Sequence, residues 1–291
     1  MRSQFLFLAC ISSTVFGCGQ RTKRYEAKPI TSPASEKGII NERGNSIETR
    51  FNTPEGFERM PADPNSFAYY LRRLPLKVPG AKVKYYYGGT KDKDVYDAVV
   101  DMEITNKDLQ QCADAVMRLR GEYFYAIKQY DNISFRLENG FKMNYTEWMN
   151  GNRIALKGDN TSWYKATAPS NTHKDFRNYM DFVFTYAGTP ALSKTLHSKN
   201  IKDIAIGDVF IVGGSPGHAV IVVDVAENSK GKVFMLAQSY MPAQETQILK
   251  NPDDSKLSPW YSGNIKGQLE TPEWTFTTDQ LKSWRAMMTA Y

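Results

Sequence analysis

Cysteine is scarce, because the chain of 291 residues holds only Cys10, Cys18 and Cys112. The first two lie in an N-terminal segment that we expect to be removed or lipidated, so Cys112 is left without a partner. This excludes a disulfide framework, although such frameworks are common in exported domains. An unpaired thiol in an oxidising compartment is either a buried core residue or a group used in chemistry. The cysteine count alone leaves both interpretations open.

Histidine is equally scarce, and its three positions do not suggest a metal site. His173 lies in a polar segment, His197 at the expected end of a helix, and His218 at the start of an apolar strand. None of them belongs to a spaced cluster of ligand residues. We therefore expect no zinc site and no cofactor.

Long apolar runs, clustered charge and internal repeats are also missing. After the N-terminal segment, no stretch is long and apolar enough to cross a membrane. The formal net charge is +6 at pH 7, but the basic residues form no stripe and no nucleic-acid motif is present. We expect no nucleic-acid partner, and a mildly basic surface suits an anionic envelope polymer.

The N-terminus has the features of a lipoprotein signal peptide. Arg2 provides a positive n-region, and residues 5–11 provide a short apolar core. The string Val15-Phe16-Gly17-Cys18 resembles a bacterial lipobox. We expect residues 1–17 to be removed and Cys18 to carry lipid. Because Phe16 is an unusual occupant of this motif, plain signal cleavage stays open.

The remaining chain is predicted to be a tether followed by one domain. Residues 18–48 are polar and show no apolar periodicity, which is typical of a disordered linker. Residues 49–291 have the length of a single domain. We expect the protein in the cell envelope, anchored to a membrane by lipid and facing the periplasm or the surface. Its expected partners are that membrane and either cell-wall peptidoglycan or an envelope protein.

Apolar periodicity predicts an α+β fold. Helices are expected at 67–74, 109–127, 176–187, 189–197 and 278–289, and strands at 83–87, 96–104, 209–212, 218–225 and 233–240. Residues 139–200 are interpreted as an inserted region, irregular over 139–172.

The helix that carries Cys112 has two candidate starts. Thr105 with Asp108, and Asp108 with Gln111, each resemble a capping box. A start at Asp108 places Cys112 just past the first turn, where the helix dipole favours a thiolate. A start at Thr105 places it one turn deeper and weakens that effect.

A predicted hairpin brings His218 close to Gln238. Strands 218–225 and 233–240 are joined by a short polar loop and should pair antiparallel. If even positions face even positions, Gln238 lies opposite His218 or one pair along. Its amide oxygen could then accept the imidazole N–H and fix the tautomer that a general base needs. Ser239 or Asp224 could take its place.

Three motifs occur in a recognisable order. Residues 112–116 read Cys-Ala-Asp-Ala-Val, residues 207–210 read Gly-Asp-Val-Phe, and residues 217–221 read Gly-His-Ala-Val-Ile. The last two resemble the Gly-Asp-hydrophobic and Gly-His-Val-Gly-Ile strands of the NlpC/P60 peptidases, in the papain-like cysteine superfamily. The first is a loose match to that family's Asp-Cys-Ser-Gly helix start. The chain also resembles a family of bacterial lipoproteins, a likeness that implies no activity.

The resemblance to NlpC/P60 peptidases implies a papain-like fold, in which an antiparallel sheet packs against the cysteine-bearing helix. It implies Cys112 as nucleophile, His218 as base and Gln238 as the orienting third residue. The implied activity is hydrolysis of an amide bond, with peptidoglycan stem peptides as the expected substrate. Such a thiol should alkylate quickly near neutral pH, and His218→Ala should slow it. Because Gln111 stands where the family has an acid, the alternative is a non-catalytic envelope lipoprotein that binds glycan or a partner protein.

Four aromatic residues are candidates for substrate binding: Tyr87, Trp163, Tyr240 and Trp260. The two tryptophans fall in expected loops, where they could stack on sugar rings. The oxyanion of an acyl transfer would be held by the backbone N–H of Cys112 and a second donor. The family analogy suggests residues 85–87 for that donor.

Overall fold

A long apolar strand organises the fold. The computed structural model describes residues 38–158 and 160–285, and in it strand β9 (His218–Asn228) is buried from His218 through Ala226. A continuous run of Val, Ile and Ala is typical of a strand covered on both faces. The sheet around β9 has the order β2-β11-β10-β9-β8-β15-β7, and every neighbouring pair is antiparallel. Strand β1 also pairs with β9, and β12 pairs with β10.

The other strands of this sheet are short. They are β1 (Glu58–Arg59), β2 (Tyr96–Val99), β7 (His197–Ser198), β8 (Val209–Val212), β10 (Gly231–Gln238), β11 (Gln247–Leu249), β12 (Trp260–Ser262) and β15 (Leu281–Ser283). Three separate hairpins are formed by β3 (Ser134–Arg136) with β4 (Lys142–Asn144), β5 (Asn152–Lys157) with β6 (Asn160–Lys165), and β13 (Gln268–Thr271) with β14 (Trp274–Thr277).

The helices are α1 (Ile47–Arg50), α2 (Phe67–Arg72), α3 (Cys112–Ala126), α4 (Tyr145–Met149), α5 (His173–Tyr186) and α6 (Thr189–Thr195), with short 3-10 turns at Tyr130–Asn132, Ile201–Asp203 and Thr278–Gln280. This mixture of helices with a mostly antiparallel sheet confirms the predicted α+β class. Each helix within residues 38–158 and 160–285 is too short or too polar to cross a bilayer.

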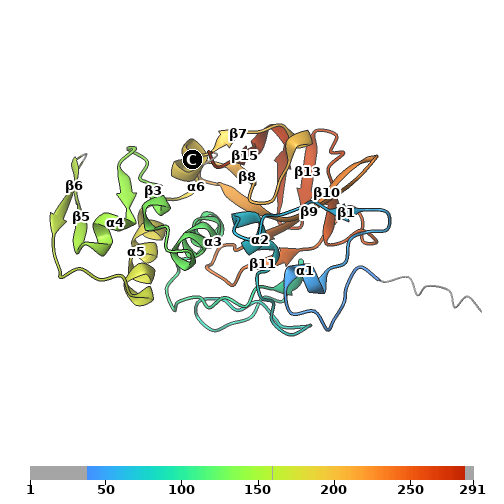
Figure 1. Cartoon of the computed structure of the whole chain (residues 1–291), viewed down its shortest axis with the longest axis horizontal. Coiled ribbons are helices and arrows are strands. Elements are labelled where there is room, and N and C mark those ends of the chain that lie inside the picture. Colours follow the sequence, from blue (N-terminus) through green and yellow to red (C-terminus); the bar gives the residue numbers. More distant parts are fainter. Residues whose placement is uncertain (1–37, 159, 286–291) are drawn as a thin grey trace, which may run out of the picture. The chain divides into compact units, whose positions relative to one another are not determined.

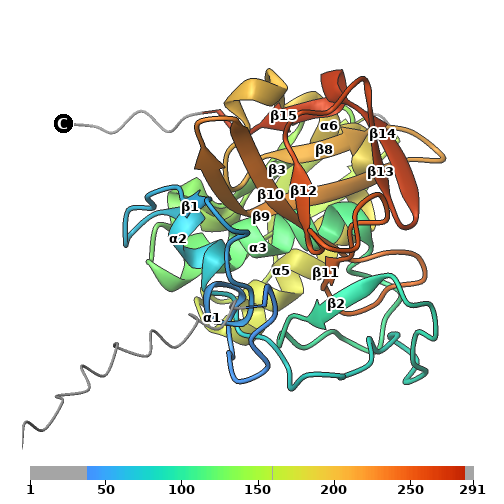
Figure 2. The same cartoon turned by 90° about the vertical axis from the view of Figure 1, so that its right-hand side faces the viewer.

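The two faces of β9 belong to two different cores. Ala219 and Ile221 point into a core shared with α3, whereas Val220 and Val222 point into a core shared with the β13–β14 hairpin. In Figure 2 the strands β8, β9 and β10 lie in front of α3 and α5. The odd positions near the start of β9 therefore face the helices, and the even positions, beginning with His218, face the hairpin.

A β-bulge sets which side chains of β9 and β10 share a face. Phe234 pairs with Val225, but beyond a register shift at Met235/Leu236, Leu236 pairs with Val222. The extra residue lies on β9, because β9 advances by three positions while β10 advances by two. A one-residue shift exchanges the two faces of a strand. The bulge therefore places Gln238 on the same face of the sheet as His218.

The bulge also corrects one expectation about Asp224. That residue was an alternative partner for His218, but beyond the bulge it lies on the opposite face, where it is fully buried. Arg59 and Arg72 each donate from Nε to its carboxylate at 2.7 Å. The two guanidinium groups satisfy a charge that burial alone would make very costly. Asp224 therefore anchors β1 and α2 to the sheet.

Residues 130–186, between α3 and α6, form a lobe of ordered hairpins and helices. In Figure 1, α3 lies between this lobe (α4, α5, β5 and β6) and the strands β9 and β10. Helix α5 approaches α3 closely at Gly121, where an added Cβ would lie 3.1 Å from the sulfur of Met180. The prediction of an irregular region over 139–172 was wrong, because β4, α4, β5 and β6 lie within it.

Three other predictions were wrong within the described residues. The tether was drawn too long, since Ile47 is buried in the main core and residues 47–50 form α1. Residues 83–87 form no strand but lead into a turn, in which the N–H of Gly88 donates to the carbonyl of Tyr85. The expected C-terminal helix begins instead as a 3-10 turn followed by β15. The predicted signal peptide and Cys18 lie outside the described residues.

Candidate active site

Cys112 is the first residue of α3, so the helix starts later than either predicted start. Gln111 is the N-cap, and its N–H donates to the Asp114 carboxylate at 2.8 Å. Gln110, just before it, is buried and has a left-handed backbone with φ 78°. Because the first N–H groups of a helix have no intrahelical acceptor, the N–H of Cys112 is available to a ligand. The thiol is placed at the positive end of the helix dipole.

Burial nevertheless keeps the Cys112 thiol neutral. The side chain is 7 % exposed, and burial raises its pKa to about 11. The backbone N–H groups of Ala219 and Ala113 act in the opposite direction, whereas the nearby Asp114 carboxyl raises the pKa further. Burial also raises the pKa of Asp114 to about 7, against the effect of the backbone N–H groups of Gln111 and Gln110. At both positions desolvation outweighs the backbone hydrogen bonds.

His218 and Gln238 are brought together as the hairpin predicted. The Nε2 atom of His218 lies 2.8 Å from Oε1 of Gln238. The imidazole is 1 % exposed and is surrounded by three aromatic rings, with centroids at 4.8 Å for Tyr240, 5.4 Å for Trp274 and 5.9 Å for Phe276. The remaining alternative, Ser239, is engaged elsewhere, since its hydroxyl bonds to that of Thr246.

The imidazole is neutral at physiological pH. Burial lowers the pKa of His218 to about 4, although the hydrogen bond to Gln238 and the charge of Glu273 raise it, and Lys91 lowers it. A ring that donates from Nε2 to an amide oxygen carries its lone pair on Nδ1. That atom makes none of the hydrogen bonds of His218, so it is the ring nitrogen available as a base.

Cys112 and His218 both lie near the start of β9, without a described contact between their side chains. Helix α3 packs on the odd-numbered side chains of β9, and the imidazole lies with the even-numbered ones. The thiol lies against the backbone N–H of Ala219, the residue after His218. Tyr240 packs edge-on against the imidazole, and a charge on Cys112 would raise the pKa of Tyr240. Among the described contacts, no hydrogen bond joins the thiol to the imidazole.

An open pocket of about 340 Å³ borders the thiol. Its lining includes Cys112, Asp114, Glu138 and Thr189, together with the loop 214–217, but not the imidazole of His218. Thr189 fixes the loop by donating from Oγ1 to the carbonyl of Gly214 at 3.2 Å. A Cβ at position 217 would lie only 2.4 Å from that Oγ1. Glycine is therefore required just before His218, because the loop and α6 approach so closely.

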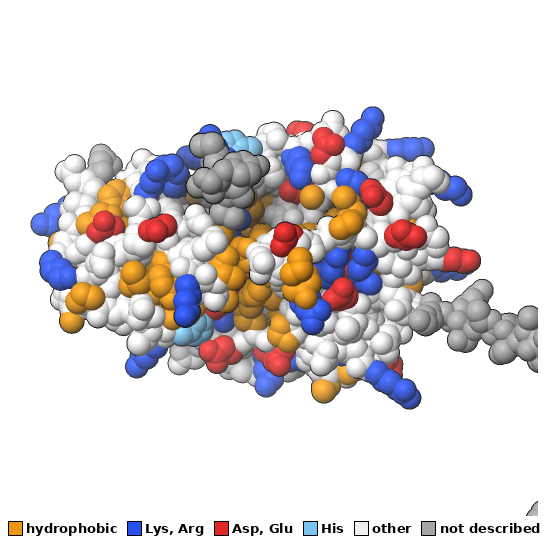
Figure 3. Space-filling view, viewed as in Figure 1, with side chains coloured by type: hydrophobic (Ala, Val, Ile, Leu, Met, Phe, Trp, Pro, Cys, Tyr) orange, Lys and Arg blue, Asp and Glu red, His pale blue; other side chains and the backbone are white. Residues whose placement is uncertain are grey.

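A second pocket lies at the other end of α3. Figure 3 shows apolar side chains gathered across the middle of the view, over α2 and α3. A pocket of about 370 Å³ there is lined by Tyr69, Tyr70, Met102, Tyr123 and Ile127 among others. It brings no nucleophile and base together, so it is not a candidate for catalysis.

The four aromatic candidates lie in very different places. Tyr240 lies at the site, against His218. Tyr87 is 61 % exposed and stacks on Tyr85, and the chain beside it pairs with the segment after Tyr240 through the N–H of Tyr86 and the carbonyl of Ala243.

The two tryptophans do not lie beside Cys112 and His218. Trp260 is fully buried in β12, and its indole N–H donates to the carbonyl of Asn52, so the prediction that it contacts substrate was wrong. Trp163 belongs to β6 and packs against Phe141. Figure 1 places β6 at the end of the lobe, far from β9 and β10.

A family model described as "Domain of unknown function (4846)" matches residues 47–283. The chain belongs to this family. The match includes α1 at its start and β15 at its end, so the family's domain contains Cys112, His218 and Gln238 together. Neither a curated protein nor a solved structure matches the chain.

Two residues at the site of this family member escaped the sequence analysis. Glu273 stands in the turn between β13 and β14, and its carboxylate accepts a hydrogen bond from Nε2 of Gln238 at 2.8 Å. Lys91, in a loop, donates to the same carboxylate at 2.5 Å. Neither residue has a sequence signal, because polar residues in turns and loops are ordinary. Within residues 38–158 and 160–285, no three His, Cys, Asp or Glu side chains are placed to hold a metal ion.

Proposed function

We propose that this protein is a lipid-anchored cysteine hydrolase of the cell envelope that cleaves an amide bond in peptidoglycan stem peptides. The observation that supports this most is the His218–Gln238 hydrogen bond, together with a thiol at a helix start that lies against the N–H of Ala219, the residue after His218. The second support is the open pocket that reaches this thiol. An orienting amide, an imidazole and a thiol are the groups that nucleophilic catalysis by cysteine requires.

In this proposal the finer fold is papain-like. The helix that begins with Cys112 packs on an antiparallel sheet, and the strand opposite it opens with His218. The lobe of residues 130–186 would form most of the insertion that separates the two motifs. These features agree with the resemblance to NlpC/P60 peptidases, which rests on the sequence motifs.

The proposed reaction starts from an uncharged pair. As the sulfur of Cys112 bonds to the substrate carbonyl carbon, the thiol proton passes to Nδ1 of His218. The imidazolium then gives this proton to the leaving amine, the C–N bond breaks, and a thioester remains. Water hydrolyses the thioester with the imidazole again acting as base. The N–H of Cys112 would hold the oxyanion.

The resting geometry imposes one condition on this reaction. Because no hydrogen bond joins thiol and imidazole, the bound substrate must bring them into contact. Catalytic hydrogen bonds are often long in the free enzyme and shorten in the substrate complex. The carboxyl groups of Asp114 and Glu138 in the pocket favour a neutral or cationic part of the substrate there.

The same observations give weight to a second candidate, a non-catalytic envelope lipoprotein that binds glycan or a partner protein. A thiol with a pKa of about 11 and an imidazole with a pKa of about 4 describe a resting pair without an activated nucleophile. In that case the pocket beside Cys112 would bind and release its ligand unchanged.

The test is amide cleavage by the full chain. Purified protein is incubated with muropeptides, and products are followed by mass spectrometry. We expect cleavage that falls by roughly 1000-fold or more in Cys112→Ala and in His218→Ala. His197→Ala is the matched control, since that histidine is exposed on the edge strand β7. Absence of cleavage by the unaltered chain, with binding to sacculi retained in Cys112→Ala, would overturn the hydrolase and support the second candidate.

A further inference from the structure

A buried carboxylate lies directly behind the orienting amide. The side chain of Glu273 is 6 % exposed, and its Oε2 atom receives hydrogen bonds from Gln238 and Lys91. Lys93 approaches its other oxygen at 3.7 Å. The chain of contacts from His218 through Gln238 to Glu273 therefore ends in an ion pair rather than in solvent.

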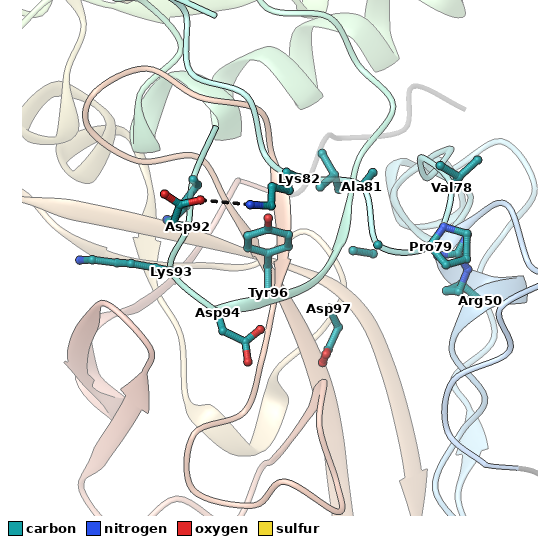
Figure 4. A pocket seen from close by; sticks show the side chains of 14 residues that line it. Arg50, Val78, Pro79, Ala81, Lys82, Asp92, Lys93, Asp94, Tyr96 and Asp97 are labelled. Atoms are coloured by element: carbon teal, nitrogen blue, oxygen red, sulfur yellow. Dashed lines mark hydrogen bonds and ion pairs between the residues drawn. The ribbon is translucent and has the colours of Figure 1, made fainter. Parts of the chain in front are cut away.

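Lys91 is held in place by several groups. Its ammonium is 2 % exposed, donates to Oε1 of Gln244 at 3.0 Å and lies 5.6 Å from the centre of the Tyr240 ring. It belongs to a loop that also lines the charged pocket of about 260 Å³ in Figure 4, where Lys82 pairs with Asp92. Burial lowers the pKa of Lys91, although its hydrogen bond to Glu273 and the charge of that residue raise it. The two side chains nevertheless form a close ion pair, with Nζ of Lys91 at 2.5 Å from Oε2 of Glu273.

An ionised carboxylate accepts hydrogen bonds and cannot donate one. The group of Gln238 that faces Glu273 must therefore be its NH₂ donor, which leaves the amide oxygen for His218. An amide oxygen is likewise only an acceptor, so Nε2 of His218 must carry the proton. The lone pair of the neutral ring is then on Nδ1. The charge at Glu273 thus determines a proton position two hydrogen bonds away.

We propose that Glu273, paired with Lys91, is a positioning residue that fixes the amide orientation of Gln238 and, through it, the base-competent tautomer of His218. The contribution of Glu273 to catalysis rests on the proposed hydrolase function, whereas its effect on the tautomer of His218 does not. The β13–β14 hairpin serves this role twice, because it carries Glu273 in its turn and also packs Trp274 and Phe276 against the imidazole.

The neutral variant Glu273→Gln separates this role from simple packing. The new side chain has nearly the same shape but can present either a donor or an acceptor to Gln238. The orienting amide is then free to turn, and the Nδ1–H tautomer becomes populated. Loss of a preference worth one buried hydrogen bond lowers the ratio of the Nε2–H to the Nδ1–H tautomer roughly tenfold. A ratio of about 10:1 would then become about 1:1, so the productive population, and with it kcat, falls about twofold with KM unchanged.

The direct test is nitrogen NMR of the histidine rings in the full chain at pH 7.5. The chain has three histidines, so three ring systems appear, and His218→Ala identifies the relevant one. We expect the Nε2–H tautomer in the unaltered chain and a mixture in Glu273→Gln. The control is Glu270→Gln in the same hairpin, where the carboxylate accepts from Thr275 instead, and it should leave the tautomer unchanged.

Two results would refute the positioning role: the Nδ1–H tautomer in the unaltered chain, or an unchanged tautomer in Glu273→Gln. Should that variant fail to fold, Glu273→Asp keeps the charge but withdraws it from the amide, and the same mixture is expected. The measurement needs no substrate. If the expected tautomers are found but no amide is cleaved, the positioning role of Glu273 stands and the hydrolase function is refuted. If amides are cleaved but the tautomer is unchanged in Glu273→Gln, the hydrolase function stands and the positioning role is refuted.

Discussion

The ionisation of Cys112 can be tested without knowing any substrate. The full chain is treated with iodoacetamide at several pH values between 6 and 10, and alkylation of the peptide that contains Cys112 is followed by mass spectrometry. The peptide readout excludes the two N-terminal cysteines. We expect the rate constant to rise about tenfold per pH unit across this range, because the reactive thiolate is populated only near the pKa of about 11.

The magnitude follows from two opposing effects. The pKa of Cys112 is raised from 9.0 to about 11, so near neutral pH its thiolate is about 100-fold rarer than that of an ordinary cysteine. A more basic thiolate is also a better nucleophile, which recovers about six- to tenfold. The net expectation is alkylation at least roughly tenfold slower than for an unburied thiol, with burial slowing it further.

This expectation reverses the one drawn from sequence motifs alone, which was a fast thiol slowed by His218→Ala. A neutral imidazole cannot stabilise a thiolate by charge, and its removal opens the site to water. We therefore expect His218→Ala to alkylate as fast as the unaltered chain or faster. A rate that is nearly constant between pH 6 and 8, together with strong slowing in His218→Ala, would show a thiolate–imidazolium pair and refute this reasoning.

Three further predictions concern stability. Asp114→Asn removes a carboxyl group whose pKa in the folded protein is raised from 3.8 to about 7. Because the folded state binds the proton more tightly than the unfolded state, the carboxyl lowers the free energy of unfolding as the pH rises from 3.8 to 7. Above pH 7 this loss reaches up to about 4 kcal/mol. In urea unfolding, the variant should therefore be more stable than the unaltered chain at pH 8 and equally stable below pH 4. The control is Asp101→Asn, which changes an exposed carboxyl group. A gain in stability at both pH values, or the same gain in the control, would contradict the raised pKa of Asp114. Asp224→Ala leaves the buried guanidinium of Arg72 and the partly buried one of Arg59 without their carboxylate. It should lower the unfolding free energy by about 3–5 kcal/mol in the same urea unfolding, and a loss below about 1 kcal/mol would contradict this anchoring role. Trp260→Ala should lower the unfolding free energy by about 3–5 kcal/mol, because it leaves a cavity in the core. Trp163 is half-buried on a hairpin, so Trp163→Ala should lower the unfolding free energy clearly less. Equal losses in the two variants would argue against this difference in burial.

Several elements were predictable because their signals are local. The period of the apolar residues identified α3 and α5, and short apolar runs identified β8, β9 and β10. The contact between His218 and Gln238 followed from side-chain alternation in a hairpin. The register of this hairpin depends on a β-bulge that no sequence pattern predicts. The same bulge places Asp224 on the opposite face of the sheet from His218.

The errors arose where distant pairing overrides local preference. Residues 278–283 carry a pattern that suggests a helix, but Leu281 and Lys282 pair with β8 and belong to a strand between β8 and β7. Residues 139–172 look polar and irregular because small hairpins such as β5–β6 bury little of each strand. Trp260 looked like a loop residue because Pro259 precedes it, yet β12 pairs with β10 at the centre of the fold.

The sequence by itself determined that the chain has a single thiol in its folded part, which residues alternate along the strands, and that one histidine opens a buried strand. Only the tertiary structure decided the state of these groups. Burial sets the proton on Cys112 and removes it from His218, because desolvation is a property of everything packed around a side chain. The partners Glu273 and Lys91 come from separate loops, so their effect on the imidazole exists only when the β13–β14 hairpin closes over β9.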